Sequence, residues 1–256
     1  MPLENVGRII SISTKKDKIK VCFSSFNTIE ISQELFTDSY YYVGKEITKK
    51  EYDKLVERTN DEKNLKYAMS ICSKKAYTKK EIIDKLKAKG ADIKSRERII
   101  NKLKDYKLID DKQFVLDYKY LHDQKLDGKI KILNSLREKG ISEVLLKDLC
   151  FDYDEELEKA KKVSPSLLLK FKNKSKTKFK EAFISSLIRK GYTYDIAQVC
   201  YDYISKDIIN DDEEKIKKAI ILLKSKGYEK NDIIKKLLLR GYKYSDINKV
   251  LGEKNE

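Results

Sequence analysis

Four glycines recur along the chain at a nearly fixed interval, and this repeat limits the possible folds more than any other feature. Gly90, Gly140, Gly191 and Gly241 are separated by 50, 51 and 50 residues. A leucine stands four residues before each glycine, and further apolar residues stand seven and eight residues before it. These offsets place apolar side chains on one face of an α-helix, and a glycine just past the helix is the usual left-handed terminator. The pattern predicts a row of small helical modules with the four glycines in structural roles.

The predicted fold is mainly α, with about four tandem three-helix-bundle repeats in an elongated, curved array behind a small N-terminal β-sheet segment. Only two prolines and nine glycines occur in 256 residues, which favours helix. We expect five parts: an N-terminal β-rich domain that ends in a helix and four helical repeats, at 1–61, 62–108, 109–153, 154–209 and 210–256.

The N-terminal part reads as β-structure. Three segments alternate apolar with polar residues and are rich in isoleucine and valine: 6–13, 18–23 and 28–32. We expect tyrosines 40 to 42 to pack the sheet against the first helix, with stacking on nucleic-acid bases as the alternative. Thr48 and Glu51 are spaced as a capping box, which predicts a helix over 49–58.

The first repeat is expected to hold helices near 65–73, 78–89 and 96–105, with Thr78 and Glu81 as a second capping box. Ser164 and Pro165 are expected to interrupt the third repeat. Cys150 and Cys200 occupy nearly equivalent repeat positions, where a small buried residue would serve the core.

The net charge of +15 is concentrated in the helical part. Residues 63–256 carry 47 lysines and arginines against 31 acidic residues, whereas residues 1–62 carry 10 against 11. Such an excess favours a polyanion or an acidic protein surface as the partner, although lysine-rich composition also follows from AT-rich coding.

Two sets of lysines are candidate binding residues. The first set stands eleven residues before each repeat glycine and comprises Lys79, Lys129, Lys180 and Lys230. The second set lies in the densest charge of the chain, KFKNKSKTKFK at 170–180, and comprises Lys170, Lys172, Lys174, Lys176 and Lys178. Alternation at period two does not build an amphipathic helix, so part of this run is expected to be irregular, and a solvated linker is the alternative reading. We expect Phe179 to pack in the core, and Phe171 to anchor the run or stack on bases.

No catalytic, metal-binding or cofactor-binding pattern occurs, so the chain is not expected to be an enzyme and no cofactor is expected. The single histidine, His122, has no nucleophile signature with it, and no phosphate-binding glycine loop appears. Asp110 and Asp111 suit the start of a helix better than a metal centre. No apolar stretch approaches the length of a membrane span and no signal peptide is evident, which predicts a cytoplasmic protein without a membrane partner.

The segment from Leu108 to Ile141 resembles the core signature of the RecX family of recombination regulators. The shared features are an Ile-Asp-Asp turn followed by a phenylalanine, a glycine and a basic residue before an isoleucine, and Leu-Arg-x-Lys-Gly-Ile. They fall here on Ile109, Asp110, Asp111, Phe114, Gly128, Lys129, Ile130, Leu136, Arg137, Lys139, Gly140 and Ile141. Lys129 stands where arginine is common in the family, and Tyr118 where tryptophan is often found.

The resemblance implies a monomeric regulator rather than a catalyst. Proteins of this family bind the RecA recombinase filament on single-stranded DNA along its groove, and they mainly inhibit recombination and ATP hydrolysis in DNA repair and the SOS response. The alternative is a helical-repeat protein that binds single-stranded DNA or RNA without RecA. A preference for RecA-coated over naked DNA would separate the two functions.

Overall fold

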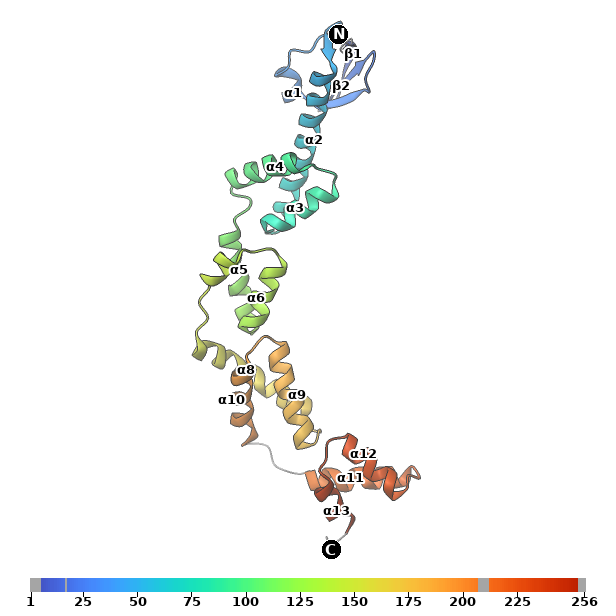
Figure 1. The fold of residues 1–256 in the computed structure, drawn as a ribbon, viewed down its shortest axis with the longest axis vertical. Coiled ribbons are helices and arrows are strands. Elements are labelled where there is room, and N and C mark those ends of the chain that lie inside the picture. Colours follow the sequence, from blue (N-terminus) through green and yellow to red (C-terminus); the bar gives the residue numbers. More distant parts are fainter. Residues whose placement is uncertain (1–5, 17, 207–211, 253–256) are drawn as a thin grey trace. The chain divides into compact units, whose positions relative to one another are not determined.

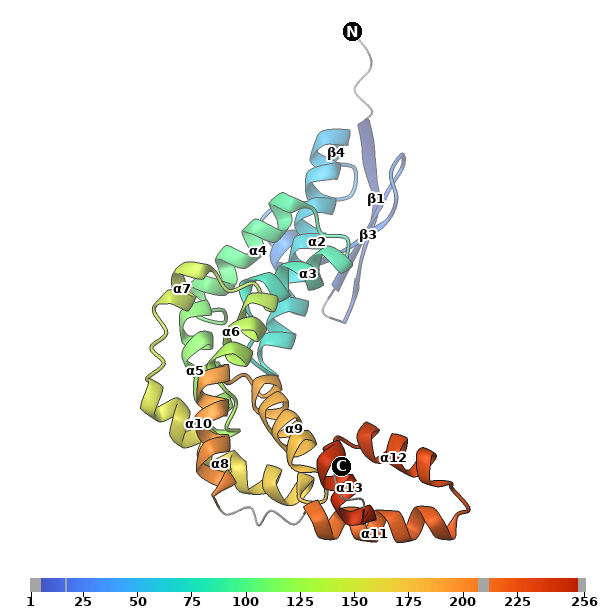
Figure 2. The same ribbon diagram turned by 60° about the horizontal axis from the view of Figure 1, so that its bottom comes forward.

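The computed structural model describes residues 6–16, 18–206 and 212–252 (Figures 1 and 2). Its contacts divide the chain into two compact units, Met1–Phe114 and Val115–Glu256. Helices dominate both units and a small antiparallel sheet stands at the N-terminus, which confirms the predicted fold class. The five-part division stays a prediction, and the expected start of its last part, at residue 210, lies outside the described residues.

The N-terminal sheet has four strands in the order β3-β2-β1-β4. The strands are β1 (Val6–Lys15), β2 (Lys18–Phe23), β3 (Ile29–Ser32) and β4 (Glu46–Thr48). The first three match the predicted segments. The fourth was missed because it has only three residues, too few for an alternating pattern, and it pairs with Val6–Arg8 at the start of β1.

The sheet packs its apolar face against α1 (Gln33–Thr37) and the start of α2 (Lys49–Cys72). The expectation that the three tyrosines pack here is wrong for two of them. Tyr40 and Tyr42 are 83% and 63% exposed, whereas Tyr41 lies against Phe36. Tyr52 from α2 fills the space instead, stacked on the ring of Phe26 at 4.5 Å.

The remaining helices follow in groups, which we call module 1 (α2–α4), module 2 (α5–α7), module 3 (α8–α10) and module 4 (α11–α13) (Figure 1). Their bounds are α3 (Lys79–Ala88), α4 (Ile93–Asp105), α5 (Asp111–Gln124), α6 (Lys129–Glu138), α7 (Glu143–Lys147), α8 (Tyr153–Phe171), α9 (Lys176–Arg189), α10 (Tyr194–Ser205), α11 (Asp212–Ser225), α12 (Lys230–Leu239) and α13 (Tyr244–Leu251). Both predicted capping boxes are present, at Thr48 and at Thr78.

Helix α2 is continuous over 24 residues, whereas two separate helices were predicted. The residues between them, 59–64, contain neither proline nor glycine, so nothing in the backbone ends the helix there. The buried Thr59 also donates its hydroxyl proton to the Leu55 carbonyl, inside the helix. The same helix therefore covers the sheet and forms the first helix of module 1.

The predicted interruption at Ser164 and Pro165 is also wrong, because α8 runs through both residues. The Ser164 hydroxyl donates to the Ala160 carbonyl at 2.9 Å, which satisfies that buried side chain within the helix. Pro165 is exposed and has no N–H group to donate to the carbonyl of Lys161. Water can reach that carbonyl on this side of the helix.

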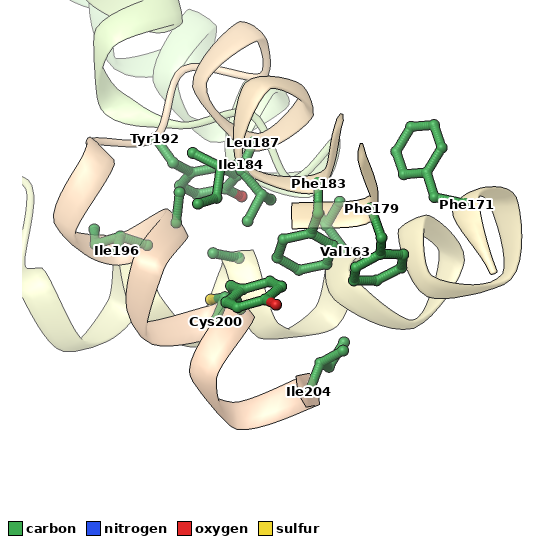
Figure 3. Packing of buried hydrophobic residues seen from close by; sticks show 13 residues of the cluster. Val163, Phe171, Phe179, Phe183, Ile184, Leu187, Tyr192, Ile196, Cys200 and Ile204 are labelled. Carbon is green, nitrogen blue, oxygen red and sulfur yellow. The ribbon is translucent and has the colours of Figure 1, made fainter. Parts of the chain in front are cut away.

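Among the clusters of described residues, the core of module 3 contains the most buried aromatic side chains. Figure 3 shows Val163, Phe179 and Phe183 converging on α10, where Cys200 is fully buried. The core role predicted for Cys200 is thus confirmed. The same expectation is wrong for Cys150, which is exposed in the segment between α7 and α8.

Candidate functional site

The repeat glycines end the middle helix of each module. Their φ angles are 79° for Gly90, 78° for Gly140, 99° for Gly191 and 82° for Gly241, and each follows a basic C-cap residue. The predicted left-handed conformation is confirmed. In each module the chain therefore turns sharply after the middle helix and delivers an apolar residue to the core two positions beyond its C-cap.

Consecutive middle helices of the second unit meet end to end. At the N-terminus of α6, the backbone N–H of Gly128 donates to the Lys190 carbonyl, and that of Ile130 donates to the Gly191 carbonyl, both at 2.9 Å. A Cβ atom on Gly128 would lie 2.4 Å from the Gly191 backbone, so glycine alone permits this approach. We call this contact the 128–191 joint. Because an N-terminus has free N–H groups and a C-terminus free carbonyls, each helix end satisfies the other.

A second joint connects α9 with α12 by the same arrangement. The Ser175 hydroxyl donates to the Arg240 carbonyl at 2.8 Å and accepts the backbone N–H of Lys178 at 3.4 Å. A Cβ atom on Gly241 would lie 2.6 Å from the Lys178 side chain. We call this contact the 175–241 joint. Here a side chain, rather than the backbone, links the two helices.

A carboxylate from the following helix group also binds the N-terminus of a middle helix, in three places. Asp111 accepts the N–H of Lys79 at 2.8 Å. Glu156 accepts that of Lys129 at 2.8 Å, and Asp212 that of Lys176 at 3.0 Å. A carboxylate near a helix N-terminus interacts favourably with the positive end of the helix dipole, whereas a lysine side chain at the same end interacts unfavourably. Asp110 accepts the N–H groups of Lys112 and Gln113, which confirms its predicted role as a helix N-cap.

The 128–191 joint encloses a buried carboxylate, Asp127, which is 3% exposed. Its oxygens accept hydrogen bonds from Lys131 and His122, both at 2.8 Å, and Lys190 lies at 3.5 Å. Burial raises the pKa of Asp127, but the hydrogen bonds from Lys131 and His122 outweigh burial and lower that pKa below its usual range. The half-buried His122 also stacks on the ring of Tyr118 at 4.2 Å.

Lysine 159 extends the same network from α8. It lies 2.7 Å from Asp123 and pairs with the buried Glu156. Burial lowers the pKa of Lys159, but the hydrogen bonds to Asp123 and Glu156 outweigh it and raise that pKa. The buried Tyr192 donates its hydroxyl proton to the Leu126 carbonyl at 2.7 Å. Sequence reasoning missed this network because its members are distant in the sequence: they come from α5, α6, α8, the loop between α5 and α6, and the residues just after α9.

The lysines that precede the repeat glycines do not share one helical position. Lys79, Lys129 and Lys230 are the first residues of α3, α6 and α12 and are exposed. Lys180 is the fifth residue of α9, because that helix starts one turn earlier, and it lies half-buried over the Tyr201 ring at 5.1 Å. The binding role of the set stays a prediction.

The lysine run surrounds the 175–241 joint. Lys170 lies in the last turn of α8, and Lys172 and Lys174 lie in the turn that follows. Lys176, Lys178 and Lys180 lie at the start of α9. The prediction of an irregular segment therefore holds only for residues 172–175. Phe171 and Phe179 are both buried, so stacking on bases by Phe171 is excluded in this conformation. Lys170, Lys172, Lys174 and Lys176 are exposed, and Lys178 pairs with Glu181 at 2.8 Å.

Within the described ranges, no three histidine, cysteine or acidic side chains are grouped closely enough to hold a metal ion. No helix in these ranges is long and apolar enough to cross a membrane.

Comparison with known proteins places the chain among regulators. No family model matches it. The regulatory protein RecX of Clostridium tetani is 30% identical over 207 residues, which cover 75% of this chain and 94% of that relative. The chain belongs to the RecX family. RecX of Bacillus licheniformis is 28% identical over 262 residues, with 97% and 98% covered, and RecX of Listeria monocytogenes serotype 4a is 26% identical over 259 residues, with 96% of each covered.

Two solved structures share the fold. A crystal structure of regulatory protein RecX superimposes with a TM-score of 0.61 at 21% identity and covers 77% of this chain and 99% of that one. RecX from Lactobacillus salivarius gives a TM-score of 0.51 at 26% identity, with 57% and 97% covered. This chain therefore shares its helical fold with these two RecX structures over the parts that they cover.

Proposed function

We propose that this chain binds the RecA filament on single-stranded DNA along its groove and mainly inhibits RecA. The observation that carries the proposal is the match to RecX regulatory proteins over nearly their full length. Binding to the filament would place it in recombination and DNA repair in the cytoplasm, as a monomer without catalytic activity.

The end-to-end joints support a partner with a repeating structure. Helix α9 has 14 residues and therefore spans about 21 Å between its two ends. Both of its ends are fixed to neighbouring middle helices, so consecutive modules present their surfaces at set intervals. A filament offers equivalent surfaces at set intervals, whereas a small ligand needs one enclosed pocket.

The charge distribution supports contact with an anionic partner. Lys172, Lys174 and Lys176 are exposed at the 175–241 joint. In this turn and the first turn of α9, residues 172–178, no acidic residue intervenes. Such lysines complement phosphate groups and acidic protein surfaces, and they speed association with either.

Net charge equally favours a protein that binds single-stranded DNA or RNA without RecA. ATP hydrolysis by RecA separates the two functions when the chain is titrated at several DNA concentrations. Under the proposed function, inhibition follows the ratio of the chain to RecA and persists when single-stranded DNA is in excess. Inhibition that disappears with added DNA would show that the chain only sequesters nucleic acid.

A further inference from the structure

The longest strand of the N-terminal sheet is paired on both sides over only part of its length. β1 has ten residues, but β4 pairs only with Val6–Arg8. One further residue, Ile9, exchanges hydrogen bonds with Lys45 and Gly44, both at 2.9 Å. From residue 10 to residue 15, β1 has β2 as its only neighbouring strand among the described residues.

The register identifies the backbone groups that are left open. Lys15 faces Lys18 across the hairpin turn, and Ser13 faces Lys20. The residues that close a two-residue hairpin bond to each other, and the direction of bonding then alternates along each strand. The N–H and C=O groups of Ile12 and Thr14 therefore point away from β2. Within the described residues, neither group meets a backbone partner on that side.

Apolar side chains adjoin this open edge. Ile10 is 56% exposed on β1, and Val43 is 60% exposed one residue before the Gly44 that bonds to Ile9. Tyr42, also exposed, precedes Val43. Exposed apolar side chains beside an open strand edge can pack against every second side chain of a strand that is added there.

Charge selects the kind of strand that fits. Residues 6–29 contain five basic residues and one acidic residue, whereas the remainder of the first 62 residues is acidic. Arg8 and Lys18 are paired with Glu46 and Glu30. Lys15 and Lys16 are exposed and have no carboxylate partner among the described residues. The open edge therefore repels a second copy of itself and attracts an acidic segment.

We propose that the open edge of β1, at Ile12 and Thr14, binds an extended acidic segment of a partner protein as an added strand. Recognition through alternating N–H and C=O groups requires a polypeptide, because nucleic acid has no such ladder. Lysines and bulges often protect sheet edges from pairing. Here the bulge lies between Ile9 and Ser11, before the open stretch, and leaves Ile12 and Thr14 in regular register. This docking edge goes beyond the proposed function of the helical modules.

The test uses the full chain and a fluorescein-labelled octapeptide in which glutamate alternates with valine. Fluorescence anisotropy should show saturable binding at low salt. The control peptide has the same sequence with every backbone nitrogen methylated, which removes all ladder donors but keeps the side chains and the charge, and it should bind at least tenfold more weakly. Equal binding of the two peptides would overturn the proposal, because it would reduce the interaction to charge alone.

Three variants locate the site. Thr14→Pro removes one open N–H and no bond to β2, so it should lower peptide affinity at least tenfold, whereas Thr14→Val should bind like the parent chain. Circular dichroism checks that the Thr14→Pro sheet is intact. Lys15→Glu with Lys16→Glu should lower affinity at least tenfold.

The matched control for charge is Lys50→Glu with Lys54→Glu on α2, which should bind the peptide like the parent chain. Unchanged affinity in a folded Thr14→Pro chain would contradict the proposal. So would peptide-independent dimers, detected by light scattering, that Thr14→Pro abolishes. Because no recombinase is present, failure of this test leaves the proposed filament binding unaffected.

Discussion

The 128–191 joint and the 175–241 joint solve the same problem with different chemistry. In both, the N-terminus of one middle helix meets the C-terminus of the next. The first joint uses two direct backbone hydrogen bonds between glycine-lined helix ends and buries Asp127 beside them. The second uses the Ser175 hydroxyl as the link. The N-cap residue determines which kind of joint forms. Glycine at the N-cap of α6 lets the backbone of the next helix approach closely, whereas serine at the N-cap of α9 uses its hydroxyl group both to accept and to donate a hydrogen bond.

Joints that recur in one repeat protein can therefore differ in strength. The first joint combines close packing with a buried ion network, so each member depends on the others. The second depends on one hydroxyl and on the carboxylate of Asp212. We therefore expect substitutions at the first joint to be more costly than equivalent substitutions at the second.

The largest expected effect comes from Gly128→Ala. Gly128 has a φ of −82°, so alanine causes no local backbone strain, but its Cβ would lie 2.4 Å from the Gly191 backbone. We expect a loss of about 3 kcal/mol in the free energy of unfolding, measured with urea, because the helix ends must separate. Gly90→Ala is the control, with φ +79° and no atom within 4 Å of the added Cβ. Its cost should be only about 1 kcal/mol from the backbone. Equal costs would contradict the close packing of this joint.

The next effect concerns charge at the two joints. Asp127→Asn should lower the free energy of unfolding by about 2 kcal/mol at pH 7, because hydrogen bonds to charged partners are lost in a buried site. Asp212→Asn, which removes a less buried carboxylate from the 175–241 joint, should cost about 0.5 kcal/mol.

The Asp127 effect should depend on pH. The folded chain lowers the pKa of Asp127 below the ordinary value of 3.8, so its contribution is complete above that value and is lost as the pH falls through the folded pKa. The difference between the parent chain and Asp127→Asn should therefore shrink below pH 3.8 in urea denaturation series. A difference that stays constant down to pH 2 would show that Asp127 acts through shape rather than charge.

A smaller effect isolates the link in the second joint. Ser175→Ala removes a helix cap and the bond to Arg240, whereas Ser142→Ala removes only the cap of α7. Loss of a cap costs about 1 kcal/mol, so Ser142→Ala should show that amount and Ser175→Ala more. Thermal unfolding compares them directly. If the two variants are equally stable, the bond between Ser175 and Arg240 adds nothing to the joint.

The smallest effect on folding is expected from the lysines around the second joint. Replacing Lys172, Lys174, Lys176 and Lys178 with glutamine should leave the helix content unchanged but weaken binding to the DNA-bound filament. For each lysine that meets one phosphate of single-stranded DNA, the slope of log affinity against log salt should fall by about 0.7.

The matched control for this variant removes four exposed lysines from the first unit, Lys54, Lys87, Lys94 and Lys104. The control should keep the steeper slope. An equal decrease of this slope in both variants would show that binding depends on the total charge of the chain and not on the lysines at the 175–241 joint.

The sequence predicted what local chemistry encodes. The apolar residues before Gly90 and the capping box at Thr78 involve residues only a few positions apart. The helix that they predict is present, with its expected beginning and end. The continuous α2 and the helical Pro165 were predicted wrongly. In the first case no residue marks a helix end, and in the second the surrounding packing outweighs the lost hydrogen bond.

The candidate site was less predictable because its contacts join distant positions. Gly128 matched a family motif, but the sequence does not show why glycine is needed there. The need follows from the contact with the backbone of Gly191, which lies more than 60 residues further along the chain. Asp127 and Lys190 likewise meet only after modules 2 and 3 pack. The periodic lysines at residues 79 and 180 have equal offsets but different exposure, because α9 begins a turn earlier than the repeat suggests.

We propose that this RecX-family chain recognises the RecA filament rather than DNA alone. The most direct measurement is its affinity for one single-stranded oligonucleotide, naked and coated with RecA, at the same series of salt concentrations. We predict tighter binding to the coated form, with the preference retained as salt rises, because protein contacts are less screened than phosphate contacts. Equal affinity for the two forms at every salt concentration would contradict the claim.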